Sequence, residues 1–239
     1  MQLPFFFEEN IPDSSSFTLS EETSRHIVLV LRMNEGEKLL ITNGRGEIFT
    51  SSLLSANKKS AKVEVINNSI IPGRTNKIII GISLIKSKNR FEWFLEKATE
   101  IGVSEIIPLI CDRTEKQQFR HDRMKNILIS AMLQSEQAWL PVLHQPLKYQ
   151  NIIQEANFKN KYIAHCLKDQ KKLLPSDLTV DGDQLILIGP EGDFTNDEIK
   201  DAIINKFIPL SLGETRLRTE TAGLVAAILF SNNKNHPRS

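Results

Sequence analysis

The sequence predicts an α/β protein in two parts, a small β-rich module over residues 1–70 and a larger domain over residues 71–239. Short strands separated by turn residues characterise the first part, which is typical of antiparallel β-structure. In the second part, apolar β-branched runs alternate with segments of helical periodicity, which favours a parallel sheet covered by helices. The boundary lies near Pro72-Gly73, in a stretch of low hydrophobicity.

The first module is predicted to be small and barrel-like. Residues 20–32 read as a short helix opened by a serine cap. Asn43-Gly44-Arg45-Gly46 reads as a hairpin turn, because Asn-Gly tolerates positive φ. Three segments are expected to be strands: 39–42, 47–50 and 61–66.

The second domain is predicted from strands and helices in alternation. Its expected strands are 77–85, 105–110, 161–166, 184–188 and 207–212. Its expected helices are 90–101, 120–138, 196–205 and 220–231, the first of them ended by Gly102. The last helix is apolar on all sides, so we expect it to be buried in the fold or against a second subunit.

Composition limits the classes of function. With 30 basic and 29 acidic residues the net charge is +1, so no global field attracts nucleic acid or membrane. No apolar run reaches the roughly 18 residues of a membrane helix, and we expect no signal peptide. Cys111 and Cys166 are far apart, which excludes a zinc ribbon and favours a cytoplasmic protein. No histidines pair at helical spacing, so no metal site is predicted.

Several catalytic signatures are missing from the sequence. It has no phosphate-binding Gly-x-x-x-x-Gly-Lys-Ser/Thr loop and no Gly-x-Ser-x-Gly elbow. The main sequence evidence for nucleoside triphosphate hydrolysis or ester hydrolysis is therefore absent.

Two loops carry the strongest functional signal. The first loop, residues 189–194, follows an apolar strand with Gly189-Pro190-Glu191-Gly192 and leads into a helix with a capping-box spacing. The second loop, residues 212–222, follows another apolar strand and carries charged and hydroxyl side chains. Ligands of parallel sheets bind beyond the carboxyl ends of strands, so we expect both loops to form one cradle. The alternatives are a tight turn with a rigid proline and an internal Arg–Glu network.

The motifs in these loops resemble those of the RsmE family of SPOUT enzymes, the bacterial 16S ribosomal RNA uridine-N3 methyltransferases. Other matching segments are Lys97–Val103, Ile107–Leu109, Asp112-Arg113, His26, Val30–Arg32 and Lys58-Lys59. One departure concerns a segment in which the family often has Glu-Gln followed by an arginine. Here Leu133 replaces the acid, and Gln137-Ala138-Trp139 follows.

The resemblance implies a PUA-like β-barrel domain over residues 1–70 and a trefoil-knotted SPOUT domain with a parallel sheet over residues 71–239. It also implies a homodimer, with the last helix at or near the interface, and S-adenosyl-L-methionine as cofactor. The expected cofactor-binding residues are Ile188, Gly189, Pro190, Glu191, Gly192, Leu212, Gly213, Leu217, Arg218, Thr219, Thr221 and Ala222. The implied partner is small-subunit ribosomal RNA or the assembled subunit.

Methylation of uridine N3 requires loss of a proton and stabilisation of negative charge on the base. Arg218 is the candidate for charge stabilisation. Glu220 or Glu100 could accept the proton or orient Arg218. The alternative for Glu100 is a salt bridge at a helix end, and for Glu220 a carboxylate favoured by the helix dipole.

RNA capture is predicted for a cluster of basic residues rather than for net charge. The first seventy residues hold seven basic and nine acidic residues, whereas residues 71–135 hold eleven and seven. The candidates are Arg25, His26, Arg32, Arg113, Arg120 and Arg123, each of which has a solvated surface charge as its alternative. Two other functions stay open, a knotted methyltransferase acting on another RNA and a non-catalytic RNA-binding assembly factor.

Overall fold

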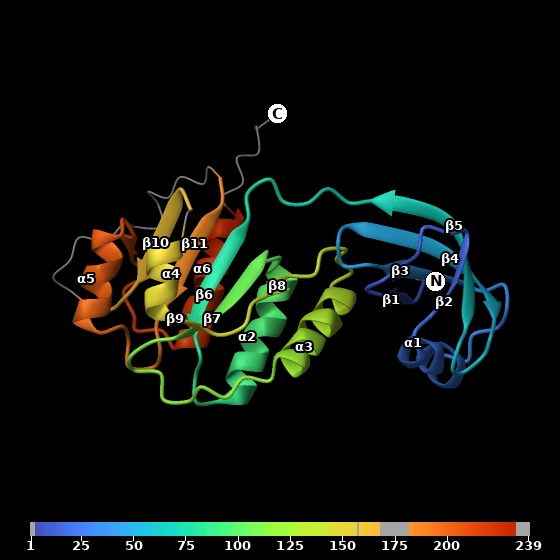
Figure 1. Cartoon of the computed structure of the whole chain (residues 1–239), viewed down its shortest axis with the longest axis horizontal. Helices are drawn as coiled ribbons and strands as arrows, with labels where there is room; N and C mark the ends of the chain where they lie inside the picture. Colours follow the sequence, from blue (N-terminus) through green and yellow to red (C-terminus); the bar gives the residue numbers. More distant parts are fainter. Residues whose placement is uncertain (1–2, 157, 168–181, 233–239) are drawn as a thin grey trace. The chain divides into compact units, whose positions relative to one another are not determined.

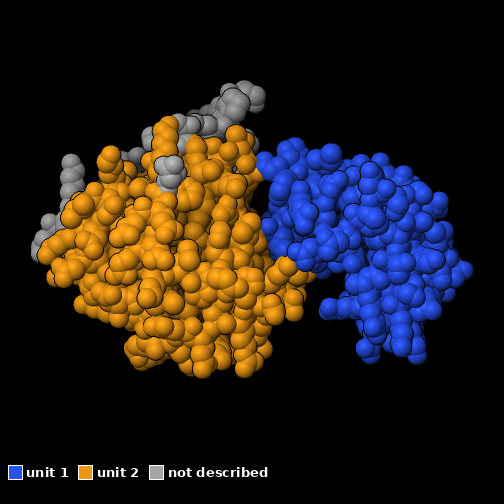
Figure 2. Space-filling view, viewed as in Figure 1, with its two compact units in different colours: residues 1–73, 132–140 blue, residues 74–131, 141–239 orange. Residues whose placement is uncertain are grey.

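A computed structural model describes residues 3–156, 158–167 and 182–232. The chain divides into two compact units, residues 1–73 with 132–140 and residues 74–131 with 141–239 (Figure 2). Residues 132–140, which the sequence analysis assigned to the second domain, thus belong to unit 1. The reason is local pairing, because Gly46 N donates to Ala138 O at 2.9 Å and Leu140 N donates to Gly44 O at 2.9 Å.

Unit 1 contains a five-stranded sheet in the order β1-β3-β4-β5-β2 (Figure 1). Its strands are β1 (Phe5–Phe7), β2 (Ser16–Thr18), β3 (Lys38–Thr42), β4 (Glu47–Ser55) and β5 (Lys62–Ile70). The predicted hairpin is confirmed, since β3 and β4 pair antiparallel and both Gly44 (φ 71°) and Gly46 (φ 93°) adopt left-handed conformations. The short edge strands β1 and β2 were not predicted, because three residues are too few to show an alternating pattern.

The helical segment of unit 1 changes its winding part-way along. Helix α1 (Glu21–Arg25) is capped by Ser20, whose hydroxyl accepts from Thr23 N at 3.3 Å as predicted. It continues as a π-helical turn, His26–Val30, and ends before Arg32 at a φ of 54°. Ile27 of this turn is fully buried with Leu39, Ile41 and Val63 of the sheet, so the turn is anchored in the core of the module.

Unit 2 contains a parallel sheet in the order β12-β10-β11-β6-β7-β8, with β9 also paired to β7. Its strands are β6 (Ile78–Ser83), β7 (Glu105–Ile110), β8 (Val142–Leu143), β9 (Leu147–Lys148), β10 (Asn160–Ala164), β11 (Gln184–Ile188) and β12 (Ile208–Leu210). Every residue of β6 and β11 is buried. The predicted parallel sheet is therefore confirmed, and its continuous apolar strands are explained by coverage on both faces.

Five helices accompany this sheet among the described residues: α2 (Lys88–Ile101), α3 (His121–Gln134), α4 (Tyr149–Glu155), α5 (Asn196–Ile204) and α6 (Thr219–Asn232). The apolar helix α6 packs against α2, β6 and β11, and the face that carries Leu224, Ala227 and Phe230 is buried within the fold. A Cβ at Gly223 would lie 2.6 Å from the Phe94 ring, which shows how closely α6 and α2 approach. Helix α3 ends before Glu136 (φ 54°), earlier than predicted.

Candidate active site

The topology of unit 2 brings three strand ends together. Ala164 at the end of β10 is in register with Ile188 at the end of β11 and with Leu210 at the end of β12. Because these strands are parallel, the segments that follow them emerge on the same edge of the sheet. The first and second loops therefore start as neighbours, with the segment after β10 between them.

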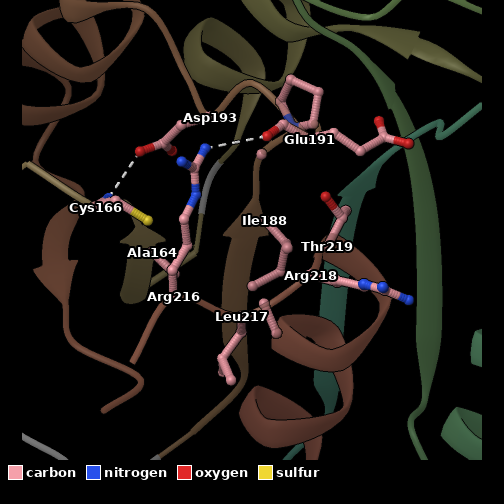
Figure 3. Close-up of a pocket in the computed structure, with 12 residues that line it drawn as sticks. Ala164, Cys166, Ile188, Glu191, Asp193, Arg216, Leu217, Arg218 and Thr219 are labelled. Carbon is pink, nitrogen blue, oxygen red and sulfur yellow. Dashed lines mark hydrogen bonds between the residues drawn. The ribbon is translucent and has the colours of Figure 1, made fainter. Parts of the chain in front are cut away.

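Both loops line a common cavity, as predicted (Figure 3). This cavity has a volume of about 220 Å³. Its lining residues are Ala164, Cys166, Ile188, Gly189, Pro190, Glu191, Asp193, Arg216, Leu217, Arg218, Thr219 and Ala222. A second cavity of about 600 Å³ shares Ala164, Cys166, Arg216, Leu217 and Ala222 with the first, so the two adjoin.

Most of the residues predicted at a cofactor site line one of these cavities. Leu212 and Gly213 line the larger cavity. Gly192 and Thr221 line neither cavity. Four residues that line the smaller cavity were not predicted: Ala164, Cys166, Asp193 and Arg216. Ala164 and Cys166 could have been predicted at the site from their position at the end of a third predicted strand.

The first loop is held to the end of β10 by Asp193. Its carboxylate accepts from Cys166 N at 2.7 Å and from Phe194 N at 2.8 Å, while its own N–H donates to Pro190 O at 2.9 Å. Asp193 has a φ of 65°, a conformation that glycine adopts most easily, and the two hydrogen bonds compensate for the cost of the side chain there. The loop is therefore ordered by local hydrogen bonds.

The capping box predicted after this loop is confirmed. Thr195 Oγ1 accepts from Glu198 N at 3.2 Å, and Glu198 Oε2 accepts from Thr195 N at 2.8 Å. Glu198 Oε1 also accepts from Asp112 N at 2.9 Å. The start of α5 is thereby tied to the segment that follows β7.

Three arginines contact the first loop. Arg113 Nη1 donates to Gly192 O at 2.6 Å and to Phe194 O at 3.4 Å. Arg216 Nη2 donates to Glu191 O at 3.3 Å, and Figure 3 shows its side chain pointing toward this carbonyl and Asp193. Arg90 of α2 places Nη2 4.0 Å from the Glu191 carboxylate. The loop is thus buttressed by cations from three other segments.

Glu220 is a buried carboxylate in the first turn of α6. The residue is 4% exposed, and its Oε1 accepts from Arg90 Nη1 at 3.3 Å. Its buried Oε2 has no hydrogen-bond partner among the described residues. The internal Arg–Glu network considered from the sequence therefore exists, but Arg90 forms it rather than Arg216 or Arg218.

Two family comparisons cover most of the chain. The RNA methyltransferase domain family matches residues 73–231, and the RNA methyltransferase PUA domain family matches residues 19–66. The chain belongs to the RsmE-type RNA methyltransferase family. The resemblance inferred from the loop motifs is confirmed, together with the α/β class and the PUA module.

Similar proteins extend over nearly the whole length of this RsmE-type chain. A structure from Porphyromonas gingivalis, described as a probable rRNA-methyltransferase, is 38% identical with a TM-score of 0.89 and covers 97% of this chain and 98% of its own. Ribosomal RNA small subunit methyltransferase E from Neisseria gonorrhoeae, bound to S-adenosyl methionine, is 28% identical with a TM-score of 0.84 and 95% coverage of both chains. The Bacillus subtilis protein of the same name is 27% identical, covering 94% of this chain and 93% of its own.

Other predicted residues of this RsmE-type chain lie outside the cavities. Glu100 lines neither of them, and its carboxylate lies 2.8 Å from Lys97 Nζ on the surface of α2, as the helix-end alternative expected. Arg123 forms two hydrogen bonds to the Glu92 carboxylate, at 2.7 and 3.0 Å, which hold the pKa of Glu92 below its ordinary value.

The remaining RNA candidates of the RsmE-type chain lie on both units. Arg25, His26 and Arg32 belong to unit 1, where the His26 ring packs edge-on against Phe6 with centroids 5.7 Å apart. Arg120 is exposed in unit 2. Across residues 3–156, 158–167 and 182–232, no cluster of three His, Cys, Asp or Glu is placed to hold a metal ion, and no helix is long and apolar enough to cross a membrane.

Proposed function

We propose that this chain transfers a methyl group from S-adenosyl-L-methionine to N3 of a uridine in 16S ribosomal RNA. The observation that supports this function best is the cavity that both loops share at the carboxyl ends of β10, β11 and β12. Family membership supports it further, since the structure of a relative, ribosomal RNA small subunit methyltransferase E from Neisseria gonorrhoeae, was solved with S-adenosyl methionine bound.

The cavities fit such a cofactor in size and in chemistry. The larger one, about 600 Å³, lies within the range of small-molecule sites. Ile188, Leu217 and Ala222 provide an apolar surface for the adenine ring, and exposed backbone groups of the loops can bind its edge. At Gly189 a Cβ would lie 3.0 Å from Phe194, a tight contact that favours glycine in the first loop.

We assign cofactor binding to the predicted residues that line the cavities and add the four residues that the structure brings there. The residues are Ile188, Gly189, Pro190, Glu191, Leu212, Gly213, Leu217, Arg218, Thr219, Ala222, Ala164, Cys166, Asp193 and Arg216. Gly192 and Thr221 then support the loops without contacting the cofactor. The bound cofactor supplies an electrophilic methyl group.

The protein must remove the N3 proton and stabilise the charge that develops on the base. Glu220 lines neither cavity itself, but it directly follows Thr219 of the cavity wall and its Oε2 has no hydrogen-bond partner among the described residues, so it is the proposed proton acceptor. Arg218 lines the cavity and is the proposed partner of the developing negative charge on O2 or O4, an interaction worth about 3 kcal/mol. Glu100 has no role in this proposal.

RNA capture is assigned to the PUA module and to exposed cations of unit 2. The proposed contacts are Arg25, His26, Arg32, Arg120 and Arg123, while Arg113 mainly supports the first loop. The target uridine must be unpaired or flipped out, because N3 faces the partner base in a duplex.

We further propose a trefoil knot, a homodimer and a cytoplasmic location, in line with the resemblance. Ile228 on α6 is 44% exposed and offers an apolar contact for a second copy.

Nucleoside mapping tests the proposal directly. Mass spectrometry of 16S ribosomal RNA from cells with and without the gene should show that 3-methyluridine is lost when the gene is absent. Unchanged 3-methyluridine would contradict the proposal, and a new unmodified uridine in another RNA would favour the alternative substrate. Calorimetry separates the non-catalytic alternative, which predicts no binding of S-adenosyl-L-methionine.

A further inference from the structure

We infer that Arg90 is a positioning residue for the proton acceptor Glu220, an inference that rests on the proposed function. Nothing in the sequence motifs pointed to Arg90, which lies in the first turn of α2, 130 residues before its partner. Its backbone N–H donates to the capping hydroxyl of Ser87 at 3.4 Å. The side chain therefore projects from a capped helix end.

The guanidinium of Arg90 reaches both loops of the site. Nη1 lies 3.3 Å from Glu220 Oε1, and Nη2 lies 4.0 Å from Glu191 Oε1. Glu191 Oε1 also accepts a hydrogen bond from Lys86 N at 3.1 Å. Of the two contacts of Arg90, the one with Glu220 is therefore the shorter, and its acceptor atom is not shared with Lys86. A planar guanidinium with several fixed donors suits such a bridge better than an ammonium group.

The two carboxylate oxygens of Glu220 therefore have different environments. Oε1 is occupied by Arg90, whereas Oε2 is buried and has no partner within the described ranges. Arg90 thus fixes the orientation of the Glu220 carboxylate through Oε1, which leaves Oε2 as the atom that accepts the N3 proton.

The other charges around Glu220 do not replace this contact. Strands β6 and β11, against which α6 packs, carry no titratable residue. The first loop contributes the negative Glu191, and the second loop contributes Arg218, for which the structure gives no bond to Glu220. On α2, Glu92 is bonded to Arg123 and Lys97 to Glu96 and Glu100. Removing Arg90 should therefore leave the Glu220 carboxylate without the contact that orients it.

Kinetics of the full chain test this role. For Arg90→Ala we expect kcat to fall about tenfold to a hundredfold, less than the roughly 10²–10⁴-fold effect of a whole general base, because Glu220 itself remains. The KM for S-adenosyl-L-methionine should change less than about threefold, because that cavity does not include Arg90. Arg90→Lys should restore part of the loss in kcat.

Two further variants separate this role from a general loss of structure. Lys97→Ala removes a cation from the same helix that lines neither cavity, and it should leave kcat unchanged. Glu220→Gln removes the ionisable group, so adding Arg90→Ala to it should cause little further loss of kcat.

The inference would be overturned if Arg90→Ala kept the wild-type kcat. It would equally be overturned if Arg90→Ala lowered kcat as much in the Glu220→Gln background as in the wild type, since that would show that Arg90 acts independently of Glu220. These outcomes require an active wild-type enzyme. A wild-type chain that makes no 3-methyluridine contradicts the proposed function itself and is recognised before any variant is measured.

Discussion

Arg216 and Glu191, twenty-five residues apart, join the two loops of the site directly, because Arg216 Nη2 donates to Glu191 O at 3.3 Å. Arg216 also lines both cavities. The side chain therefore connects the walls of the site at the point where the cavities adjoin.

Loss of this contact should weaken cofactor binding. For Arg216→Ala we expect about a fivefold increase in the Kd for S-adenosyl-L-methionine, since a hydrogen bond of this kind contributes about 1 kcal/mol. Calorimetry measures the change, with Lys200→Ala on α5 as the control because Lys200 lines neither cavity and pairs with Asp197 at the surface. An unchanged Kd would show that the bridge is irrelevant to binding.

Arg218 should affect turnover far more than affinity. Its proposed partner is charge that develops during the reaction, so Arg218→Ala should lower kcat about a hundredfold to a thousandfold with little change in cofactor Kd. Single-turnover kinetics and calorimetry on the same preparation test this. Equal losses in the two quantities would count against the assigned role.

Asp193 should be replaced more easily by glycine than by alanine. Both changes remove the bonds to Cys166 N and Phe194 N, but alanine also keeps a Cβ at a φ of 65°, which costs about 1–2 kcal/mol. Thermal unfolding should therefore give a lower Tm for Asp193→Ala than for Asp193→Gly. The reverse order would mean that backbone conformation does not limit this loop.

A carboxylate at the other end of the sheet should make stability depend on pH. Burial alone would raise the pKa of Glu105, but hydrogen bonds from His144 at 2.9 Å and Lys77 at 3.0 Å outweigh it and lower that pKa below 4.5. Because the folded-state pKa is depressed, this stabilisation is present above the ordinary value and is lost as the pH falls through the folded value.

The matching measurement compares Tm against pH for the wild type and Glu105→Gln. The wild type should lose more stability than the variant below about pH 4.5. Parallel curves would show that Glu105 does not contribute to the acid dependence.

Regular patterns made most of the fold predictable. The continuous apolar runs of β6 and β11 identified buried parallel strands, and the turn at Gly44 identified a hairpin. Strands β8 and β9, with two residues each, and the seven-residue α4 are too short to show a period.

The part of the site that is formed by contiguous residues could be predicted from the sequence. Glycine and proline in the first loop marked a tight turn at a strand end, and this indicated the cavity. Arg90 could not be found in that way, because its role arises from a tertiary contact with a residue far along the chain. Glu100 belongs to a family motif but lines neither cavity and pairs with Lys97, which no local pattern reveals.

The return of residues 132–140 to unit 1 makes this module a composite of two distant stretches. Trp139 Nε1 donates to Ile71 O at 2.9 Å, and its ring leaves no space for a side chain at Gly46. A fragment that ends at residue 73 would lack Trp139, and the turn of its hairpin would lose this packing contact. Anyone grafting the module of one relative onto the enzyme of another would have to transplant both stretches at once.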